Sequence, residues 1–466
     1  MPEIRTDENG NQILVTTPGE KTKPGKKLKG AVNGRLNDGQ IANLVLKEWK
    51  RPLAYQAGQF WSYEADAGWV VCTHQLVNKA NDLRGANTEQ SVMKILAARC
   101  ALPDLEHCEE HSTYWEATAR GWEPFKVSHN QVLFSNGLLA IDEAGCMEFT
   151  PTEKRIIFGP RVSIPYTDDL LEESCTEFET LMEYALAADE REYLQRVGGL
   201  ILQPHVILRG QIVFWGVPHS GKTTLATALA TAPGGVRGQS AVSEERLVGD
   251  KWATTMLVNK FASVSNDSEF TPKWESFMKQ YTSGSFTAEA KFSKPCTVPA
   301  TAKLISTCNE MQGIKDLSGA AAMRYRIFRF NNPILESGRI EQGEQMTAGY
   351  WAHPSRRKGI VRWLLDGLIE AVVHGLQEPV SMKQAKAEAI AESNPMIDFI
   401  SNNIEREEGA FLSCTDFLEA LGLDYRHQGA KQAKMLIERI WKIKKSRKRI
   451  AKDENPIWGY ENLKII

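Results

Sequence analysis

The strongest chemical signal in the sequence is a glycine-rich segment with the spacing GxxxxGK[ST], which runs from Gly216 to Thr223. Glycines at these positions let successive backbone N–H groups turn toward phosphate oxygens, at the positive end of a helix dipole. Lys222 would reach the β- and γ-phosphates of a nucleotide, and the Thr223 hydroxyl would hold Mg²⁺. We therefore expect ATP and Mg²⁺ to bind at Gly216, Val217, Pro218, His219, Ser220, Gly221, Lys222, Thr223 and Thr224.

Two acidic residues end a second candidate strand, Lys260–Glu269, and a parallel sheet places its ligands at such strand ends. Asp267 would hold Mg²⁺ and Glu269 would orient the attacking water, or the two roles are reversed. The segment is more polar than a buried strand usually is, so a surface turn is the alternative interpretation.

Amide and guanidinium groups follow in two further candidate strands. Thr301–Asn309 is a strand pattern that ends in an amide, and Asn309 is the expected sensor of the γ-phosphate. Met323–Phe330 alternates arginine with apolar residues, which predicts a strand with one guanidinium face. Arg324 is expected to stabilise charge on transferring phosphate oxygens, in the manner of an arginine finger. Arginines that are merely solvated are the alternative.

Apolar patterning identifies the elements that position these residues. Gln211–Trp215 is a short apolar run typical of a buried parallel strand. Thr224–Thr231 is rich in alanine and leucine and has no helix breaker, which predicts a helix. The glycine-rich motif thus lies between a strand and a helix, as phosphate binding requires. Residues 205–332 alternate strands and loops, which predicts the α/β fold class.

The whole chain has the length and composition of a multidomain globular protein. Its 466 residues suggest about three domains, and 42% hydrophobic residues exclude a disordered polymer. A formal net charge of −2 excludes a wholly basic nucleic-acid coat. Eight cysteines without a CxxC pair predict no disulfide framework and favour a reducing cytoplasm. Charges interrupt the longest apolar stretches, so we expect no membrane partner.

The order of these parts resembles that of the superfamily-three helicases of the phage, plasmid and poxvirus primase-helicase type. The shared order is a P-loop, an acid strand, the segment Lys279–Gly284, a hairpin through Lys291, a strand ending in an amide and an arginine strand. The resemblance covers roughly residues 40 to 405. It includes flanking segments at Gln59–Glu64, Leu133–Asp142, Ile164–Asp169, Gly359–Gly367 and Asn394–Phe399.

The resemblance implies an AAA+ type core in a ring, commonly a hexamer, with ATP bound between subunits. Lys222, Thr223, Asp267 and Asn309 would then serve the nucleotide from one subunit. Arg324, together with Arg326, would reach in from the next. A pre-sensor hairpin would line a central pore, so DNA contacts are expected at Lys279, Lys291, Phe292 and Lys294. An ordinary exposed hairpin is the alternative.

Departures from the family pattern qualify what the resemblance implies. Ser285 stands where the family commonly has an acidic residue. About 40 residues precede the matching region, too few for a primase-polymerase domain, so we do not expect primer synthesis. A separate primase or polymerase is an expected partner instead.

The last part of the chain is rich in basic residues. Lys431–Arg449 holds nine Lys or Arg residues and one acid, and helices followed by a short hairpin suggest a winged helix. Duplex DNA, such as an origin, is the expected ligand; a solvated basic face or a contact that stabilises the ring is the alternative. The residues concerned are Lys442, Lys444, Lys445, Arg447, Lys448 and Arg449.

The resulting expectation has five regions. They are a flexible basic tail (1–38), an N-terminal α+β domain with connecting helices (39–200), a superfamily-three AAA+ helicase core (201–335), a helical lid or linker (336–395) and a basic winged-helix-like domain (396–466). We expect an ATP-dependent DNA helicase for replication of a phage or other mobile element. It would act in the bacterial cytoplasm and translocate on single-stranded or forked DNA. The alternatives are an ATPase that loads or remodels another protein and an origin-binding initiator.

Overall fold

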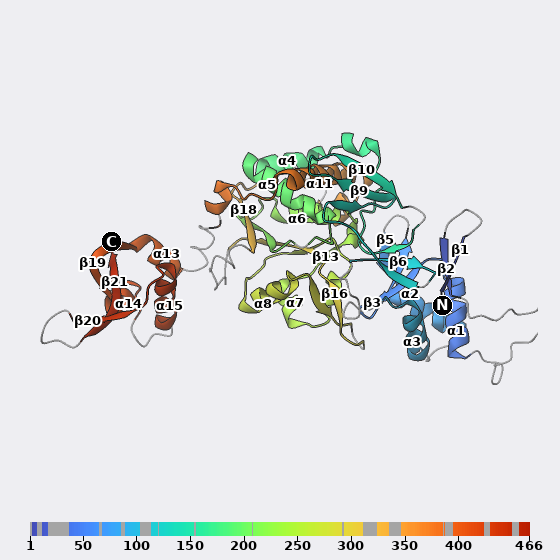
Figure 1. Ribbon diagram of the computed structural model, residues 1–466, viewed down its shortest axis with the longest axis horizontal. Helices are drawn as coiled ribbons and strands as arrows, with labels where there is room; N and C mark the ends of the chain where they lie inside the picture. Colours follow the sequence, from blue (N-terminus) through green and yellow to red (C-terminus); the bar gives the residue numbers. More distant parts are fainter. Residues whose placement is uncertain are drawn as a thin grey trace, which may run out of the picture. The chain divides into compact units, whose positions relative to one another are not determined.

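A computed structural model of the chain divides into two compact units, each described separately below (Figure 1). The first comprises residues 1–268, 273–309 and 323–382, and the second comprises 269–272, 310–322 and 383–466. The structure describes residues 2–6, 12–16, 37–64, 68–84, 89–102, 113–119, 121–152, 155–206, 208–290, 293–310, 324–334, 346–384, 386, 395–423, 429–449 and 456–466.

The N-terminal part of the first unit contains small antiparallel sheets. Three helices pack with one of these sheets around a core that includes Ile41, Phe60 and Leu96. The elements are β1 (Pro2–Thr6), β2 (Gln12–Thr16), α1 (Asp38–Glu48), β3 (Leu53–Gln56), β4 (Gln59–Glu64), β5 (Gly68–Val71), α2 (Thr73–Arg84), α3 (Glu89–Cys100), β6 (Tyr114–Thr118), β7 (Gly121–Phe125), β8 (Gln131–Leu133), β9 (Gly137–Ile141), β10 (Met147–Pro151) and β11 (Ile157–Phe158).

The predicted N-terminal tail departs from expectation at its start. β1 and β2 pair as antiparallel strands, with Ile4 opposite Leu14. Between them the sequence has Asn9-Gly10, a typical hairpin turn, flanked by runs that contain Ile and Val. The prediction of a tail is therefore wrong for these two strands, because the sequence pattern around Asn9-Gly10 favours a hairpin. The lysine-rich stretch Lys21–Lys29 lies outside the described residues.

A five-stranded parallel sheet forms the centre of the first unit and confirms the predicted α/β class. Its strand order is β13-β14-β17-β12-β18. The strands are β12 (Gln211–Gly216), β13 (Gln239–Ala241), β14 (Ala262–Ser265), β17 (Lys303–Cys308) and β18 (Tyr325–Phe330). The residues of β14 and β17 are buried throughout, as expected of strands with neighbours on both sides.

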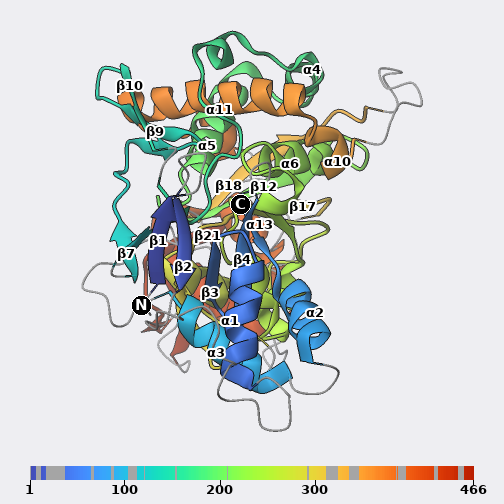
Figure 2. The same cartoon turned by 90° about the vertical axis from the view of Figure 1, so that its right-hand side faces the viewer.

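Helices cover this sheet and link it to the N-terminal part. In both ribbon views the long helix α11 lies along α5, and residues from both helices enter the same core as the sheet (Figures 1 and 2). The connecting elements are η2 (Asp168–Glu172), α4 (Thr176–Ala185), α5 (Ala188–Gly199), η3 (Leu200–Leu202), α6 (Lys222–Thr231), η4 (Val236–Gly238), α7 (Glu244–Gly249), η5 (Ala253–Leu257), α8 (Pro272–Tyr281), β15 (Ser285–Ala288), β16 (Cys296–Pro299), α10 (Ala348–Trp351) and α11 (Pro354–His374). The region predicted as 39–200, most of 201–335 and much of 336–395 therefore share one compact unit.

The second unit has its own core, which includes Phe417, Ile437 and Tyr460. Its antiparallel sheet has the order β19-β21-β20. The elements are α13 (Pro395–Asn403), β19 (Ile404–Ser413), α14 (Cys414–Ala420), α15 (Ala430–Ile440), β20 (Ser446–Lys448) and β21 (Ile457–Ile465). The order along the chain is therefore a helix, a strand, two helices and the β20–β21 hairpin. Among the described residues, no helix combines the length and apolar character needed to cross a membrane.

Candidate nucleotide site

The predicted P-loop joins a buried strand to a helix, as the motif requires. β12 ends at Gly216 and α6 begins at Lys222, while Val217, Pro218 and His219 between them are exposed. Gly216 has φ +144°, and a Cβ there would lie 2.0 Å from the Phe330 carbonyl oxygen. Only glycine fits this close approach of two backbones.

Neighbouring segments hold the loop in place. The Val217 N–H donates to the Phe330 carbonyl at 3.0 Å, and the Ile334 N–H donates to the His219 carbonyl at 2.9 Å. Gly221 adopts a left-handed conformation (φ +86°) at the helix N-cap, beside the Ile334 side chain. The end of β18 and the residues after it therefore bind the loop and fix its position.

Lys222 closes over the loop and is 7% exposed. Its ammonium donates to the carbonyl oxygens of Gly216 at 2.9 Å and Val217 at 2.5 Å. Burial lowers the pKa of Lys222, while the Cys308 thiol and the Asp267 carboxylate act in the opposite direction. The ammonium also donates to Ser220 Oγ at 3.3 Å, so its hydrogen-bond partners are all neutral oxygens, which phosphate oxygens could replace.

Asp267 lies two positions after the end of β14, so the segment with the acidic residues does contain a strand. Asp267 itself is exposed and has φ +50°, a conformation that aspartate tolerates better than most residues. The Ser268 N–H donates to the Thr307 carbonyl at 3.0 Å, which ties this turn to β17. Glu269 is also exposed, but the carboxylate that influences Lys222 is that of Asp267.

The donor set at this edge fits a magnesium ion. Thr223 is exposed in the first turn of α6, and the Asp267 carboxylate lies near Lys222, which Thr223 follows in the chain. Hydroxyl and carboxylate oxygens are ligands that Mg²⁺ prefers. Thr223 and Asp267 are therefore the residues that would hold it.

Asn309 lies at the carboxyl end of the parallel strands, the same end of the sheet as the P-loop. It follows β17 directly and is exposed. Trp215 pairs with Cys308 across the parallel strands β12 and β17, so Asn309 is level with Gly216. The P-loop, Asp267 and Asn309 thus all lie at the carboxyl end of the parallel sheet.

Arg324 and Arg326, the two arginines predicted to act as fingers, lie at the opposite, N-terminal end of the parallel strands. The Arg324 carbonyl accepts a hydrogen bond from Gln211 N at 2.7 Å, and Arg326 pairs with Ile212 near the start of β12. Phe330, six residues after Arg324, pairs with Gly216 at the P-loop end. Six residues of strand span about 20 Å. Arg324 and the P-loop of the same chain are therefore separated by the length of the sheet.

The prediction of a single guanidinium face on this strand is wrong for Arg329. Alternation along a strand puts Arg324 and Arg326 on one face and Arg329 on the other. The Arg329 guanidinium lies over the Trp215 ring, 4.8 Å from the ring centroid. Arg326 and Arg329 are three positions apart, and an odd separation along a strand puts two side chains on opposite faces.

The predicted DNA contacts of the first unit lie on a helix and a hairpin. Lys279 is exposed on α8, and β15 pairs with β16 as an antiparallel hairpin between the acid strand and β17. Lys294 is exposed near the hairpin turn, whereas Lys291 and Phe292 lie outside the described residues. A Cβ at Gly58 would lie 2.3 Å from Ser293 Oγ, so the hairpin touches the β3–β4 turn. A cavity of about 310 Å³ lies between the two turns.

The remaining predicted DNA contacts belong to the second unit. Arg447 and Lys448 lie in β20, and the other four lie beside it. Lys442, Lys444, Lys445 and Arg449 flank the strand between α15 and the end of the described segment.

Comparison with known proteins gives one family match. Residues 214–324 match the profile of a family of unknown function (DUF5906). This segment begins in the P-loop strand and ends at Arg324, so it contains the P-loop, Asp267 and Asn309. No curated protein matches the chain.

Solved structures give weak similarities over most of the chain. The apo structure of the NrS-1 C-terminal region (305–718) is 11% identical, with a TM-score of 0.48, and the match covers 90% of this chain and 98% of that one. The A form apo structure of the same region is 12% identical, with a TM-score of 0.44, and covers 91% and 99% of the two chains.

A buried polar network beneath the acid turn was not predicted. Glu244, at the start of α7, is 3% exposed, and its Oε1 accepts hydrogen bonds from Gln211 Nε2 and Ser306 Oγ. Its N–H donates to Ser265 Oγ at 3.1 Å, and Ser268 Oγ donates to Ser265 Oγ at 3.0 Å. Burial raises the pKa of Glu244 to about 7, and hydrogen bonds from Ser306 and Gln211 reduce the shift. The serines that made the acid strand look polar therefore have buried partners.

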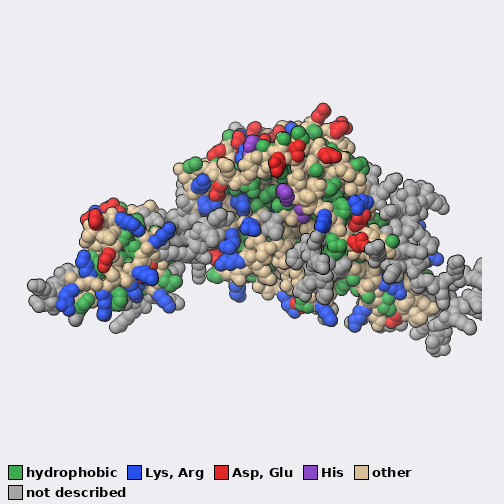
Figure 3. Space-filling view, in the orientation of Figure 1, with side chains coloured by type: hydrophobic (Ala, Val, Ile, Leu, Met, Phe, Trp, Pro, Cys, Tyr) green, Lys and Arg blue, Asp and Glu red, His purple; other side chains and the backbone are tan. Residues whose placement is uncertain are grey.

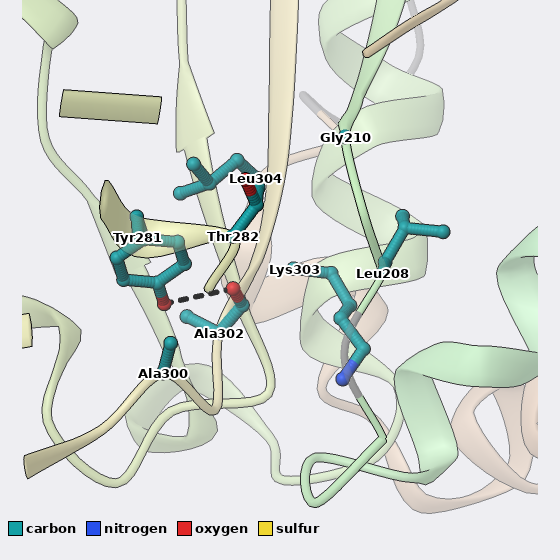
Figure 4. A pocket seen from close by; sticks show the side chains of 8 residues that line it. All are labelled: Leu208, Gly210, Tyr281, Thr282, Ala300, Ala302, Lys303 and Leu304. Atoms are coloured by element: carbon teal, nitrogen blue, oxygen red, sulfur yellow. Dashed lines mark hydrogen bonds between the residues drawn. The ribbon is translucent and has the colours of Figure 1, made fainter. Parts of the chain in front are cut away.

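Another buried charge lies at the start of β17 (Figure 4). The Lys303 ammonium donates to the carbonyls of Gln203 at 2.8 Å and Val206 at 2.7 Å, and burial lowers its pKa to about 7. Tyr281 OH donates to the Ala302 carbonyl at 2.9 Å, as the dashed line in Figure 4 marks. The adjoining cavity has a volume of about 10 Å³, room for about one water molecule and far too little for a nucleotide.

Proposed function

We propose that the protein is an ATP-dependent DNA helicase of the superfamily-three, AAA+ type. The observation that carries the proposal is the convergence of the P-loop, Asp267 and Asn309 at one edge of a five-stranded parallel sheet. Lys222 would bind the β- and γ-phosphates, and Asn309 would contact the γ-phosphate or its attacking water. Mg²⁺ at Thr223 and Asp267 would neutralise charge on the phosphates.

The strand order supports the AAA+ assignment. β17, which ends at Asn309, lies between the P-loop strand β12 and the acid strand β14. In this order the Asn309 side chain would lie between Lys222 and Asp267, near the γ-phosphate. If the acid instead followed the strand directly beside β12, no strand end would lie between the lysine and the acid to carry such a sensor.

The position of the arginines supports an assembly of several chains. Arg324 lies at the sheet edge opposite the P-loop, about 20 Å away along the strand, so it does not reach the nucleotide of its own chain. A guanidinium that serves ATP from this position must belong to a neighbouring subunit. We therefore propose a homo-oligomeric ring, with a hexamer as the expected size.

The hairpin β15–β16 is the proposed contact with single-stranded DNA. Lys294 beside its turn and Lys279 on α8 are exposed cations that would bind backbone phosphates. The hairpin is inserted between the acid strand and the amide strand, so its movement would be tied to nucleotide chemistry. Replication of a phage or other mobile element is the proposed setting, with a separate primase or polymerase as partner.

The deciding experiment is ATP-dependent strand separation on a forked DNA, with Lys222→Ala as the inactive variant. We expect separation by the wild type and none by the variant, with circular dichroism showing that both are folded. Equal separation by the two proteins would refute the assigned nucleotide site. DNA-stimulated ATP turnover without separation would instead favour a loader or remodeller, and turnover indifferent to DNA would favour an initiator.

A further inference from the structure

The hairpin of the second unit exposes a large aromatic side chain. Trp458, in β21, is 41% exposed, whereas Tyr460 two residues later is fully buried in the core. Trp458 is therefore not required to fill this core. Large exposed aromatic side chains on a small unit often mark a binding surface.

Cations surround this tryptophan. Arg447 is directly opposite Trp458 across the antiparallel strands β20 and β21, with its guanidinium carbon 4.9 Å from the ring centroid. The Lys445 ammonium lies 5.2 Å from the same centroid. We call Lys445, Arg447 and Trp458 the wing cluster.

Basic residues gather in the sequence beside the wing cluster. Residues 442–449 include six lysines and arginines and no acid. The acids Glu405 and Glu407 instead pair with Lys464 at the far end of β21. In Figure 3, blue side chains are spread over the visible face of this unit, and the fewer red ones lie in its upper and middle part. An aromatic ring next to the cations of Lys445 and Arg447 matches the chemistry of a nucleotide, which presents a base and a phosphate.

Helix α15 carries a different mixture of side chains. Its exposed side holds Lys431 and Met435, the latter 62% exposed, and Lys434 and Glu438 are half-buried. These lysines could contact phosphates, but none of the four side chains offers an aromatic face on which an unpaired base could stack.

We propose that the wing cluster binds unpaired nucleotides of single-stranded DNA. Trp458 stacks on one base, and Lys445 and Arg447 bind the phosphates on either side. This site differs from the duplex contact expected from the sequence, because stacking needs a base whose face is open. The choice of DNA as ligand rests on the proposed function, but binding at the cluster requires no ATP hydrolysis.

The first test measures affinity of the full-length protein for a fluorescent single-stranded oligonucleotide, without nucleotide. Trp458→Ala should weaken binding by about 5- to 150-fold, as removal of one stacking partner does, and Trp458→Phe should retain most of it. Affinity for a blunt duplex should change much less. Met435→Ala is the matched control, because it removes an exposed apolar side chain from the same unit and should leave affinity unchanged.

The second test identifies the contact directly, because other DNA-binding surfaces could mask a loss of affinity. An oligonucleotide carrying 5-iododeoxyuridine is irradiated with the protein, and the modified peptide is mapped by mass spectrometry. We expect the adduct at Trp458, in wild type and in Lys222→Ala alike. Adducts confined to other segments, or an equal loss with Met435→Ala, would overturn the proposal. If Trp458 is crosslinked but the protein separates no strands, the proposed binding site is supported and only the proposed helicase function is refuted.

Discussion

Replacing Glu244 by glutamine should change how the stability of the protein depends on pH. The carboxyl is 3% exposed, and the groups that donate to it, from Gln211 and Ser306, are neutral. Burial raises its pKa from 4.5 to about 7. The folded protein therefore keeps a proton on Glu244 at pH values where the unfolded chain has lost it.

The size of the effect follows from the two pKa values. One unit corresponds to about 1.4 kcal/mol, so the protonated carboxyl contributes about 3 kcal/mol to folding below pH 4.5. This contribution is lost as the pH rises through about 7. Because glutamine has no such proton, Glu244→Gln should gain stability relative to wild type across this window. In a unit of this size, a gain of about 3 kcal/mol corresponds to a relative Tm shift of about 4 °C.

The assay compares thermal unfolding of wild type, Glu244→Gln and Glu245→Gln at about pH 5 and about pH 8. Comparison at equal pH cancels the titration of all other groups. Glu245 is the exposed neighbour of Glu244, so its variant should follow wild type. If the difference in Tm between Glu244→Gln and wild type is the same at both pH values, the carboxyl does not titrate as its burial implies and the reasoning is refuted.

Two further predictions concern the nucleotide site. Gly216→Ala should abolish binding of a fluorescent ATP analogue, because its Cβ would lie 2.0 Å from the Phe330 carbonyl oxygen; Gly249→Ala, whose Cβ would meet no described atom within 4 Å, should bind normally. Retained binding in Gly216→Ala would contradict the assigned loop geometry. Arg324→Ala should assemble but hydrolyse ATP poorly, and mixing it with Lys222→Ala should restore part of the turnover. Mixed assemblies without any recovery would count against an arginine acting between subunits.

Local pattern was sufficient to predict the strands that carry the site. The apolar run Gln211–Trp215 and the motif after it specify a buried strand, a loop and a helix, all of which the structure contains. The strands before Asp267 and Asn309 were also predicted correctly. Each of these predictions depends on neighbours in sequence, which is the information that spacing and periodicity hold.

Contacts between distant segments explain what the sequence did not predict. Glu244 lies in Ser243-Glu244-Glu245-Arg246, which looks like the exposed start of a helix. It is buried because Gln211 and Ser306 approach it from two other strands. The polar character of Ala262–Ser265 counted against a buried strand for the same reason, since serines are expected to be exposed unless their partners are known.

The connection between strands indicates how DNA contact and ATP turnover would be coupled. Asp267 lies two positions after the end of β14 and Asn309 one position after the end of β17, and the hairpin β15–β16 lies in the chain between those two strands. The base of the hairpin is closed by the Ala300 N–H, which donates to the Gly284 carbonyl, and Tyr281 OH at the end of α8 donates to the carbonyl of Ala302, the residue before β17. A hairpin displaced along DNA would therefore pull on the start of β17, whose other end carries Asn309. Because β17 is buried throughout and joins these two ends, the proposed coupling would need no other element between the hairpin and Asn309.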